Sequence, residues 1–425
     1  HLRENNAFVV DSSPKLLLNP GSPLKGEFIV ATVPPTVKMR VIPDMIPEYM
    51  LDIESQKDSY MTAWANWGRV SRSDDGRFFF SVSDHRGYGA HINIYEYVPA
   101  RNDLVHKVID FGETVGWTPS SITDGKMHGY PGIMPDGTMW AASHYGVYPD
   151  SSWWANGYRG SWLISYNIYT HKTENWGIPC VGSWLPFFNL DRERGRFAAT
   201  SGSTMFFCWD TINKRTRYAG YPPNGWIWWN RGMLLDETTG KFWSFDSADK
   251  QRRFMSFDPE YNTFVRYEVP SPGMRGYTDR RAMDGWYYCS DGAKGLYRFN
   301  PNGFDGPVSE PLGITWEGTH DVRQMVVSPK GRYVYYLPHW IPKSGGSPLV
   351  QYDVMTGKKK AICWLAEYYF AEYGYWPFGS FGMEISEDGS SIVIVMNGTF
   401  QGRDTMYGKP ALFVVGIPEE ERVED

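Results

Sequence analysis

The sequence predicts an all-β fold, a seven-bladed β-propeller built from four-stranded antiparallel blades. The main observation is a glycine-bearing turn that recurs seven times in 425 residues and always precedes a short aromatic or β-branched run. These glycines are about 45 to 61 residues apart, a spacing typical of a repeat architecture. The seven turns contain Gly76, Gly137, Gly195, Gly240, Gly285, Gly331 and Gly389.

Each repeat predicts the same four strands. The glycine turn joins the first two, and runs such as RFFFSVSDH form the second strand. Third strands such as HINIYEYV and weaker fourth strands such as RTRYAGY follow. Because antiparallel blades arranged in a ring leave few exposed edges, a propeller suits this pattern.

The seventh repeat ends after its third strand, ALFVVGI. We therefore expect an early segment, either FIVATV at 28–33 or the stretch near Val41 to Ile53, to supply the outer strand and close the ring. The whole chain, 1–425, then forms a single domain, with an N-terminal extension and the closing strand within 1–60. No linker rich in Ser, Gly or Pro marks a second domain.

Composition narrows the possible partners. A net charge of −6 without a long basic run argues against nucleic acid. No apolar stretch approaches the roughly 20 residues that cross a membrane, so we expect no membrane association. The chain begins at His1 rather than Met, which we interpret as processing of a secreted or periplasmic protein. We expect this protein to be a monomer.

The sequence contains four cysteines that lie far apart. Their spacing leaves two states equally open, buried free thiols or disulfides.

Propeller geometry predicts where a site lies. Residues just before each first strand and just after each second strand lie at the same end of a blade, where loops carry function. Histidines occupy several such positions, namely His85, His128, His144, His320 and His339. Arg231 precedes the fourth blade, and Arg280, Arg281 and Arg323 are placed similarly. A basic inner rim suits a ligand carboxylate, although each Arg could instead pair with a neighbouring blade.

This residue set favours one chemistry. The sequence has no serine nucleophile elbow or phosphate-binding loop, and the acidic residues near the rim are scattered, which disfavours glycoside hydrolysis. β-Elimination from a uronic acid fits better. Arg or a metal neutralises the carboxylate, a His or Tyr removes the C5 proton, and a second such group protonates O4.

Four stretches carry a resemblance to a known group of enzymes. DHRGYG at 84–89, DGKMHG at 124–129, YRGSWLISY at 158–166 and ENWGIP at 174–179 resemble the seven-bladed propeller polysaccharide lyases. These include ulvan lyases of families 24 and 25 and the rhamnose–glucuronate lyases that act on gum arabic. The resemblance implies cleavage of a rhamnosyl-(1→4)-glucuronate linkage in an anionic polysaccharide or oligosaccharide, leaving a C4–C5 unsaturated uronate.

The resemblance also implies residue roles. His128 and His144 take the histidine roles, Tyr221 (or Tyr218) resembles the acid–base tyrosine, and Arg231 resembles the group that neutralises the carboxylate. The substrate-binding residues are then His85, Tyr88, Trp153, Trp154, Trp228, Arg280 and Arg323. The insert YGVYPDSSWWANGYRG departs from the family pattern. Its two tryptophans would close one end of the cleft. Whether the enzyme acts in endo or exo mode, and whether its substrate is ulvan or an arabinogalactan-type chain, therefore stays open.

No cofactor is required by this chemistry, but some propeller lyases bind a metal in the channel. His320, next to Asp321, is the candidate ligand for calcium, manganese or zinc, although the spacing is no ligand signature. Other functions stay open. A non-catalytic carbohydrate-binding propeller would use the same aromatic residues, and a glycoside hydrolase would need two facing carboxylates. A protein-interaction scaffold would show stricter repeats.

Overall fold

The computed structural model describes residues 7–43, 64–84, 87, 89–146, 151–317, 321–339, 348–403 and 408–424. Its fold is all-β, a seven-bladed propeller with four-stranded antiparallel blades, as the sequence predicts. All seven predicted turn glycines join the first and second strands of a blade and have positive φ, from 64° at Gly195 to 89° at Gly331. Because side chains other than glycine rarely adopt this conformation, the turns depend on glycine.

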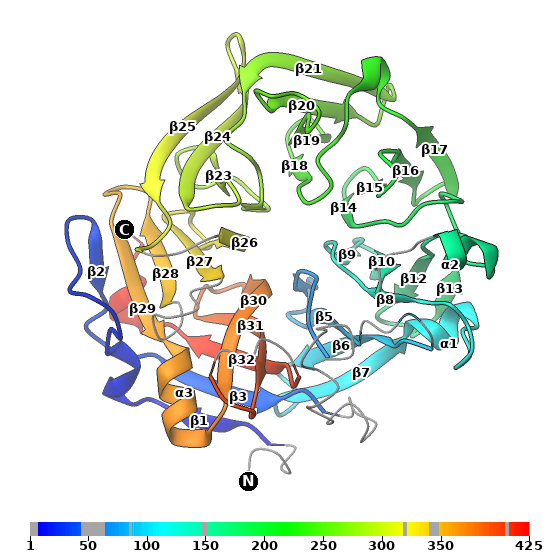
Figure 1. Cartoon of the computed structure of the whole chain (residues 1–425). Coiled ribbons are helices and arrows are strands. Elements are labelled where there is room, and N and C mark those ends of the chain that lie inside the picture. The colour runs from blue at the N-terminus through cyan, green and yellow to red at the C-terminus, as the bar shows by residue number, and fades with distance from the viewer. Residues whose placement is uncertain are drawn as a thin grey trace. The chain divides into compact units, whose positions relative to one another are not determined.

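The chain divides into two compact units. Figure 1 labels the strands and helices of both. The first unit consists of 48–274 with 304–307 and contains blades one to four. The second unit consists of 1–47, 275–303 and 308–425 and contains blades five to seven.

In the first unit, each blade runs from an innermost first strand to an outermost fourth strand. Blade one comprises β4 (Ser71–Arg72), β5 (Phe78–Ser83), β6 (Ile92–Val98) and β7 (Leu104–Asp110). Blade two comprises β9 (Gly132–Ile133), β10 (Thr138–Ala142), β12 (Leu163–Asn167) and β13 (Thr173–Asn175). Blade three comprises β14 (Phe187–Asp191), β15 (Arg196–Thr200), β16 (Phe206–Asp210) and β17 (Arg215–Gly220). Blade four comprises β18 (Leu234–Asp236), β19 (Lys241–Phe245), β20 (Arg253–Asp258) and β21 (Thr263–Pro270).

Four short elements of this unit were not predicted. A separate two-stranded sheet pairs β8 (Asp124–Lys126) with β11 (His144–Tyr145). Helix α1 (Phe111–Val115) follows β7, and helix α2 (Ser151–Ala155) lies in the aromatic insert. A 3-10 turn, Pro223–Gly225, precedes blade four.

The innermost segments of blades one, two and three are hydrogen-bonded to one another. The Arg69 amide donates to the Gly129 carbonyl at 3.1 Å, and the Tyr130 amide donates to the Phe188 carbonyl at 3.0 Å. Glycine permits this close approach, because a Cβ atom on Gly129 would collide with the ring of Phe188. A Cβ atom on Gly232 would likewise meet the carbonyl oxygen of Met274. The chain segments that enter these inner strands therefore pack closely against their neighbours.

The second unit contains the last three blades and the N-terminal strands. Blade five comprises β22 (Gly276–Tyr277), β23 (Tyr287–Ser290), β24 (Gly295–Gly303) and β25 (Gly306–Ile314). Blade six comprises β26 (Asp321–Val327), β27 (Tyr333–His339), β28 (Pro348–Asp353) and β29 (Lys359–Trp364), with β2 (Phe28–Val30) added in parallel at its outer edge. Blade seven comprises β30 (Trp376–Ile385), β31 (Ser391–Thr399), β32 (Ala411–Gly416), β3 (Thr36–Val41) and β1 (Val9–Asp11). Helix α3 (Leu365–Tyr373) and two 3-10 turns, Pro14–Leu17 and Glu419–Glu421, complete the unit.

The predicted N-terminal contribution to blade seven is confirmed, and the strand that supplies it ends at Val41, where the second expected segment begins. FIVATV forms β2 in blade six, and 44–53 lie outside the described residues. The fourth strand is β3, which pairs antiparallel with β32 from Thr36↔Gly416 to Val41↔Ala411. Val37 and Met39 of this strand are buried in the core of blades six and seven, so its apolar alternation fixes the register.

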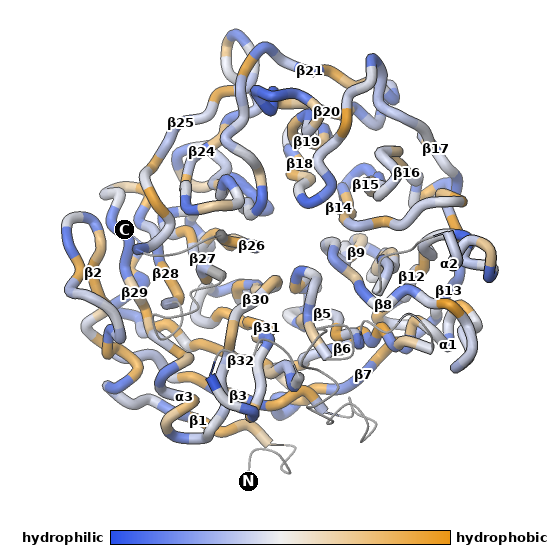
Figure 2. The backbone as a smooth tube through the Cα atoms, viewed as in Figure 1, coloured by the Kyte–Doolittle hydropathy of each residue, from blue (hydrophilic) through white to orange (hydrophobic). Residues whose placement is uncertain are grey.

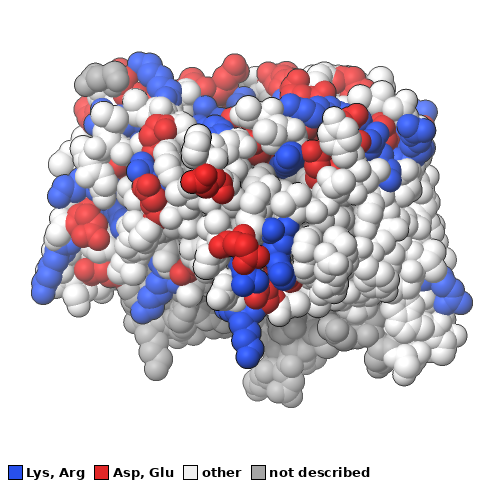
Figure 3. Space-filling view, turned by 90° about the horizontal axis from the view of Figure 1, so that it is seen from above, with Lys and Arg blue, Asp and Glu red and all other residues white. Residues whose placement is uncertain are grey.

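Apolar burial organises both units. In Figure 2 the hydrophobic segments fall mainly within strands, whereas many connecting turns are hydrophilic. All four cysteines, which are Cys180, Cys208, Cys289 and Cys363, are buried thiols rather than disulfides. Acidic and basic side chains are interspersed on the face drawn in Figure 3. Among the described residues, no helix has the length and apolar character needed to cross a bilayer.

A buried carboxylate near the C-terminus ties the N-terminal segment to blade six. Glu421, 3% exposed, accepts hydrogen bonds from the amides of Thr32 and Val33 and from the Thr32 hydroxyl. Its other oxygen pairs with Lys360 Nζ at 2.7 Å. Although burial opposes ionisation, these donors lower the pKa of Glu421 to about 2.

We expect Glu421→Gln to lower the free energy of unfolding by about 2 kcal/mol at pH 7. Because the folded-state pKa is depressed, this stabilisation is complete above the ordinary glutamate pKa and is lost as the pH falls toward about 2. Chemical denaturation at several pH values measures it. Glu420→Gln, at an exposed neighbour, is the control, and an equal loss at pH 2.5 and pH 7 would contradict the assignment.

Candidate functional site

Basic and aromatic side chains gather at one end of blades one to four, where the chain enters each innermost strand. Trp67, His128, Trp184 and Arg231 lie shortly before β4, β9, β14 and β18, respectively. The β8–β11 sheet adds residues at the same end of blade two. We call the resulting group the cationic cluster, and its members are Trp67, Lys126, His128, His144, Tyr145, Trp184 and Arg231.

The β8–β11 sheet positions the part of the cluster that comes from blade two. Its strands pair antiparallel, with Lys126 opposite His144 and Tyr145 opposite Asp124, and the register shifts between His144 and Tyr145. Such a bulge changes the direction of neighbouring side chains. This small sheet therefore places an ammonium, an imidazole and a phenol at one end of the blade.

Ring contacts show that the cluster is continuous. The rings of His128 and His144 meet edge to face with centroids 5.0 Å apart, and those of His144 and Tyr145 lie 4.1 Å apart. Trp67 contacts His128 at 5.5 Å, and Trp184 contacts Tyr145 at 5.4 Å. Blades one, two and three thus each contribute at least one ring.

Two cations complete the arrangement. Lys126 Nζ lies 5.0 Å from the ring centre of Trp67 and 5.1 Å from that of Tyr145. Arg231 hydrogen-bonds the side chain of Tyr145, which brings blade four into the cluster. Burial, reinforced by the nearby Arg231 charge, lowers the pKa of Lys126 to about 7. Burial also lowers the pKa of Arg231.

The cluster has a buried layer and an accessible layer. Lys126, His128 and His144 are at most 6% exposed, whereas Tyr145 and Arg231 are half-buried. Trp67 and Trp184 are half-buried as well. A ligand would therefore touch the phenol, the guanidinium and the two indoles, while the lysine and imidazoles act on it from beneath.

A buried carboxyl network supports the small sheet. Asp124, with no exposed surface, accepts hydrogen bonds from the Ser143 hydroxyl at 2.6 Å and the Tyr158 hydroxyl at 2.5 Å. Burial raises the pKa of Asp124 to about 6 despite these donors. Trp153 and Trp154 of α2 pack on the Tyr158 ring at 5.7 Å and 5.1 Å. The insert therefore braces β8, and Trp153 is buried rather than lining a cleft.

Tyr221 lies on the surface of blade three. It follows β17, the outermost strand of blade three, and its side chain is 63% exposed. The alternative, Tyr218, packs on Phe206 and donates its hydroxyl to the Tyr221 carbonyl at 2.6 Å. The phenol that meets Arg231 and His144 is Tyr145, a residue that the sequence argument did not single out. Its position directly after His144 was the available signal.

Three other predicted binding residues have structural contacts. Trp228 is 3% exposed and donates its indole N–H to the Gly232 carbonyl at 3.2 Å, so it is a core residue rather than a binding surface. Arg280 donates to the Val327, Ser328 and Pro329 carbonyls in the turn of blade six. Arg323 stacks over Phe381 at 4.6 Å.

Several predictions fall outside the described residues. His85, Tyr88 and His320 are not described, and neither is the side chain of His339. In the part of the chain that is described, no group of three or more His, Cys, Asp or Glu side chains could hold a metal ion. The metal at His320 therefore stays a prediction.

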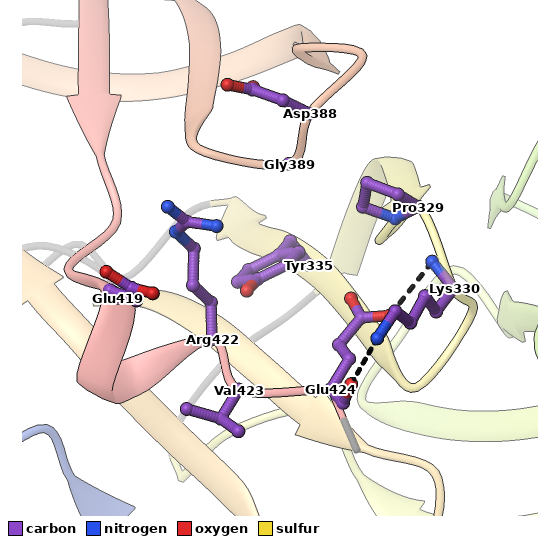
Figure 4. Close-up of a pocket in the computed structure, with 9 residues that line it drawn as sticks. All are labelled: Pro329, Lys330, Tyr335, Asp388, Gly389, Glu419, Arg422, Val423 and Glu424. Carbon is purple, nitrogen blue, oxygen red and sulfur yellow. Dashed lines mark hydrogen bonds between the residues drawn. The ribbon is translucent and has the colours of Figure 1, made fainter.

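Two cavities lie elsewhere. One, of about 530 Å³, is at the β19–β20 end of blade four and is lined by Trp226, Asp246 and Arg266 among others. The other, of about 270 Å³, lies in the second unit. Figure 4 shows Tyr335 and Arg422 in this second cavity, beside Lys330, whose amide and Nζ donate to Glu424. It contains none of the predicted site residues.

Comparisons with known proteins add little. No family model matches the chain, and no curated protein matches it. Among solved structures, a crystal structure of a nidogen/laminin complex is similar, with 11% sequence identity and a TM-score of 0.41. The match covers 67% of this chain and 92% of that chain. Similarity this low bears on neither activity nor partners.

Proposed function

We propose that this protein is a polysaccharide lyase that cleaves a rhamnosyl-(1→4)-glucuronate linkage by β-elimination. The observation that supports it most is the contact between Arg231 and Tyr145 above a layer of Lys126, His128 and His144. A guanidinium beside a phenol supplies both requirements of the reaction, which are charge neutralisation at the carboxylate and proton transfer at C5.

The reaction balances without an external reagent. Arg231 pairs with the C6 carboxylate and stabilises the negative charge that develops when the C5 proton leaves. The C5–H electrons form the C4–C5 double bond, and the C4–O bond breaks. Rhamnose departs with the bridging oxygen, which takes up a proton and becomes its anomeric hydroxyl.

Tyr145 is the group best placed to move the proton. The C5–H and C4–O bonds of an equatorially substituted D-glucuronate lie on one face of the ring, so one side chain can serve both transfers. The phenolate of Tyr145, stabilised by Arg231 and Lys126, removes the C5 proton, and the resulting phenol protonates the leaving oxygen. His144, whose ring contacts that of Tyr145, orients the phenol.

The test is incubation with a rhamnosyl-glucuronate oligosaccharide while ultraviolet absorption of the unsaturated uronate is recorded. Wild-type protein should produce the band, and His144→Ala should weaken it because His144 orients the phenol of Tyr145. Loss of this buried ring should also lower the melting temperature. Release of rhamnose without the band would identify a glycoside hydrolase. Binding without any product would identify a carbohydrate-binding propeller, and either result would overturn the proposal.

The pKa of Lys126 predicts a pH dependence. Lys126 carries its charge below about pH 7 and loses it above, so KM for an anionic substrate should rise as the pH passes through that value. Lys126→Arg keeps the charge and should hold KM constant to higher pH, whereas Lys126→Met should raise KM about tenfold at pH 6. Initial rates from pH 5 to 9 measure this.

The neighbouring charge that acts on Lys126 comes from Arg231 on blade four, while the rings of His128 and His144 on blade two contact each other. If the pH dependence of KM came from titration of an imidazole, it would remain in both lysine variants. A Lys126→Arg profile identical to that of the wild type would therefore assign the pH dependence to a histidine and contradict the lysine assignment.

A further inference from the structure

The larger cavity and Arg231 share one loop. Residues 221–233 connect β17 to β18, with Trp226 at the cavity and Arg231 in the cationic cluster. Five residues of extended chain span at most about 17 Å. Trp228 pairs with Asp246 in an isolated bridge, so the loop before β18 and the loop after β19 lie at the same end of blade four. Trp226 at the cavity therefore lies within about 17 Å of Arg231 along the chain, at the same end of the blade.

The cavity walls are held by a fixed ion pair. Asp246, 1% exposed, accepts from the Ile227 amide at 2.9 Å and the Ala248 amide at 3.1 Å. Arg266 Nη1 donates to its other oxygen at 3.0 Å. Because a buried carboxylate anchors one side of the guanidinium, Arg266 keeps one orientation.

Arg266 also offers donors to a ligand. Its guanidinium carbon lies 5.1 Å from the ring centre of Trp226, so the two side chains form one wall. Within the described residues, Asp246 is its only hydrogen-bond acceptor, which leaves other N–H groups of the guanidinium available. Lys250, exposed at the tip of the β19–β20 loop, and Arg253 bring the lining to three basic and two acidic side chains.

We propose that this cavity is an accessory subsite that binds a second, negatively charged sugar residue of the glycan whose glucuronate occupies the cationic cluster. The inference rests on the proposed function for the identity of the glycan. An indole next to a sugar ring and a guanidinium next to its carboxylate provide apolar contact and charge recognition together. The subsite would favour chains over the minimal disaccharide.

The test compares two substrates, a rhamnosyl-glucuronate disaccharide and an oligosaccharide with several alternating rhamnose and glucuronate residues. We expect Trp226→Ala to lower kcat/KM for the oligosaccharide about tenfold and to leave the disaccharide unchanged. Lys250→Ala should act in the same direction with a smaller effect. Tyr261→Ala, at an aromatic residue that is 76% exposed and outside the cavity lining, is the matched control.

The outcomes separate this inference from the proposed function. If the wild type forms no unsaturated product from either substrate, the lyase assignment fails. Calorimetry of oligosaccharide binding to wild type and Trp226→Ala still tests the subsite, and equal affinities would overturn it. If product forms but Trp226→Ala changes both substrates equally or neither, the subsite is wrong. Equal binding of a neutral oligosaccharide would overturn its preference for charge.

Discussion

Tyr145→Phe should lower kcat on a rhamnosyl-glucuronate substrate by about 10²- to 10⁴-fold, the usual contribution of a general acid–base group. The substitution removes only the phenolic oxygen. The ring contacts of Tyr145 with His144 and Trp184 remain, so binding and folding should change little. KM should accordingly stay within about threefold of the wild-type value. Formation of the unsaturated uronate under saturating substrate measures the loss.

The matched control is Tyr221→Phe, which alters the tyrosine that the sequence argument favoured. Because Tyr221 is exposed beyond the outermost strand of blade three, its hydroxyl should be dispensable. Full turnover by Tyr145→Phe together with loss of turnover by Tyr221→Phe would restore the sequence assignment and reject the one made from the structure.

Arg231→Ala should lower kcat/KM by about 10²- to 10³-fold, because the elimination requires a neutralised carboxylate. Arg231→Lys should recover only part of this, since an ammonium cannot form a bidentate pair. Thermal stability should not fall. Burial lowers the pKa of Arg231, so folding moves a charged guanidinium out of water at a cost in free energy, and alanine removes that cost. Steady-state rates and melting temperatures together measure both effects.

A carboxyl-reduced substrate makes this test specific. Wild-type protein should lose most of its activity on the neutral analogue, and Arg231→Ala should cause no further loss there. Arg215→Ala, at an exposed position on β17, controls for a general loss of charge. An equal effect of Arg231→Ala on charged and neutral substrates would assign Arg231 a structural role.

The fold could be predicted because its main signal is local. A glycine with positive φ is needed wherever the first two strands of a blade meet, and seven such turns are visible in the sequence. The closing strand could not be located, because FIVATV (28–33) and the segment that forms β3, TVKMRV (36–41), are both short and both contain β-branched apolar residues. Only their tertiary partners, β29 and β32, distinguish them.

The site could be predicted only in part. Propeller geometry correctly brings His128, His144 and Arg231 together, since it depends on strand order alone. It does not indicate side-chain direction. The register of the β8–β11 ladder shifts next to Tyr145, and no sequence periodicity reveals that shift. Trp228 was misassigned because a tryptophan in a loop looks accessible until its packing is known.

The glycines that let neighbouring inner segments touch have a further consequence. Each of Gly68, Gly129 and Gly232 directly follows a member of the cluster, namely Trp67, His128 or Arg231. Assembly of the scaffold depends on the glycine, whereas chemical character depends on the residue before it. Substitutions at these three positions can therefore change the chemical character of the surface one blade at a time while the glycine contacts between blades are kept. A protein engineer could diversify the same three positions in a library.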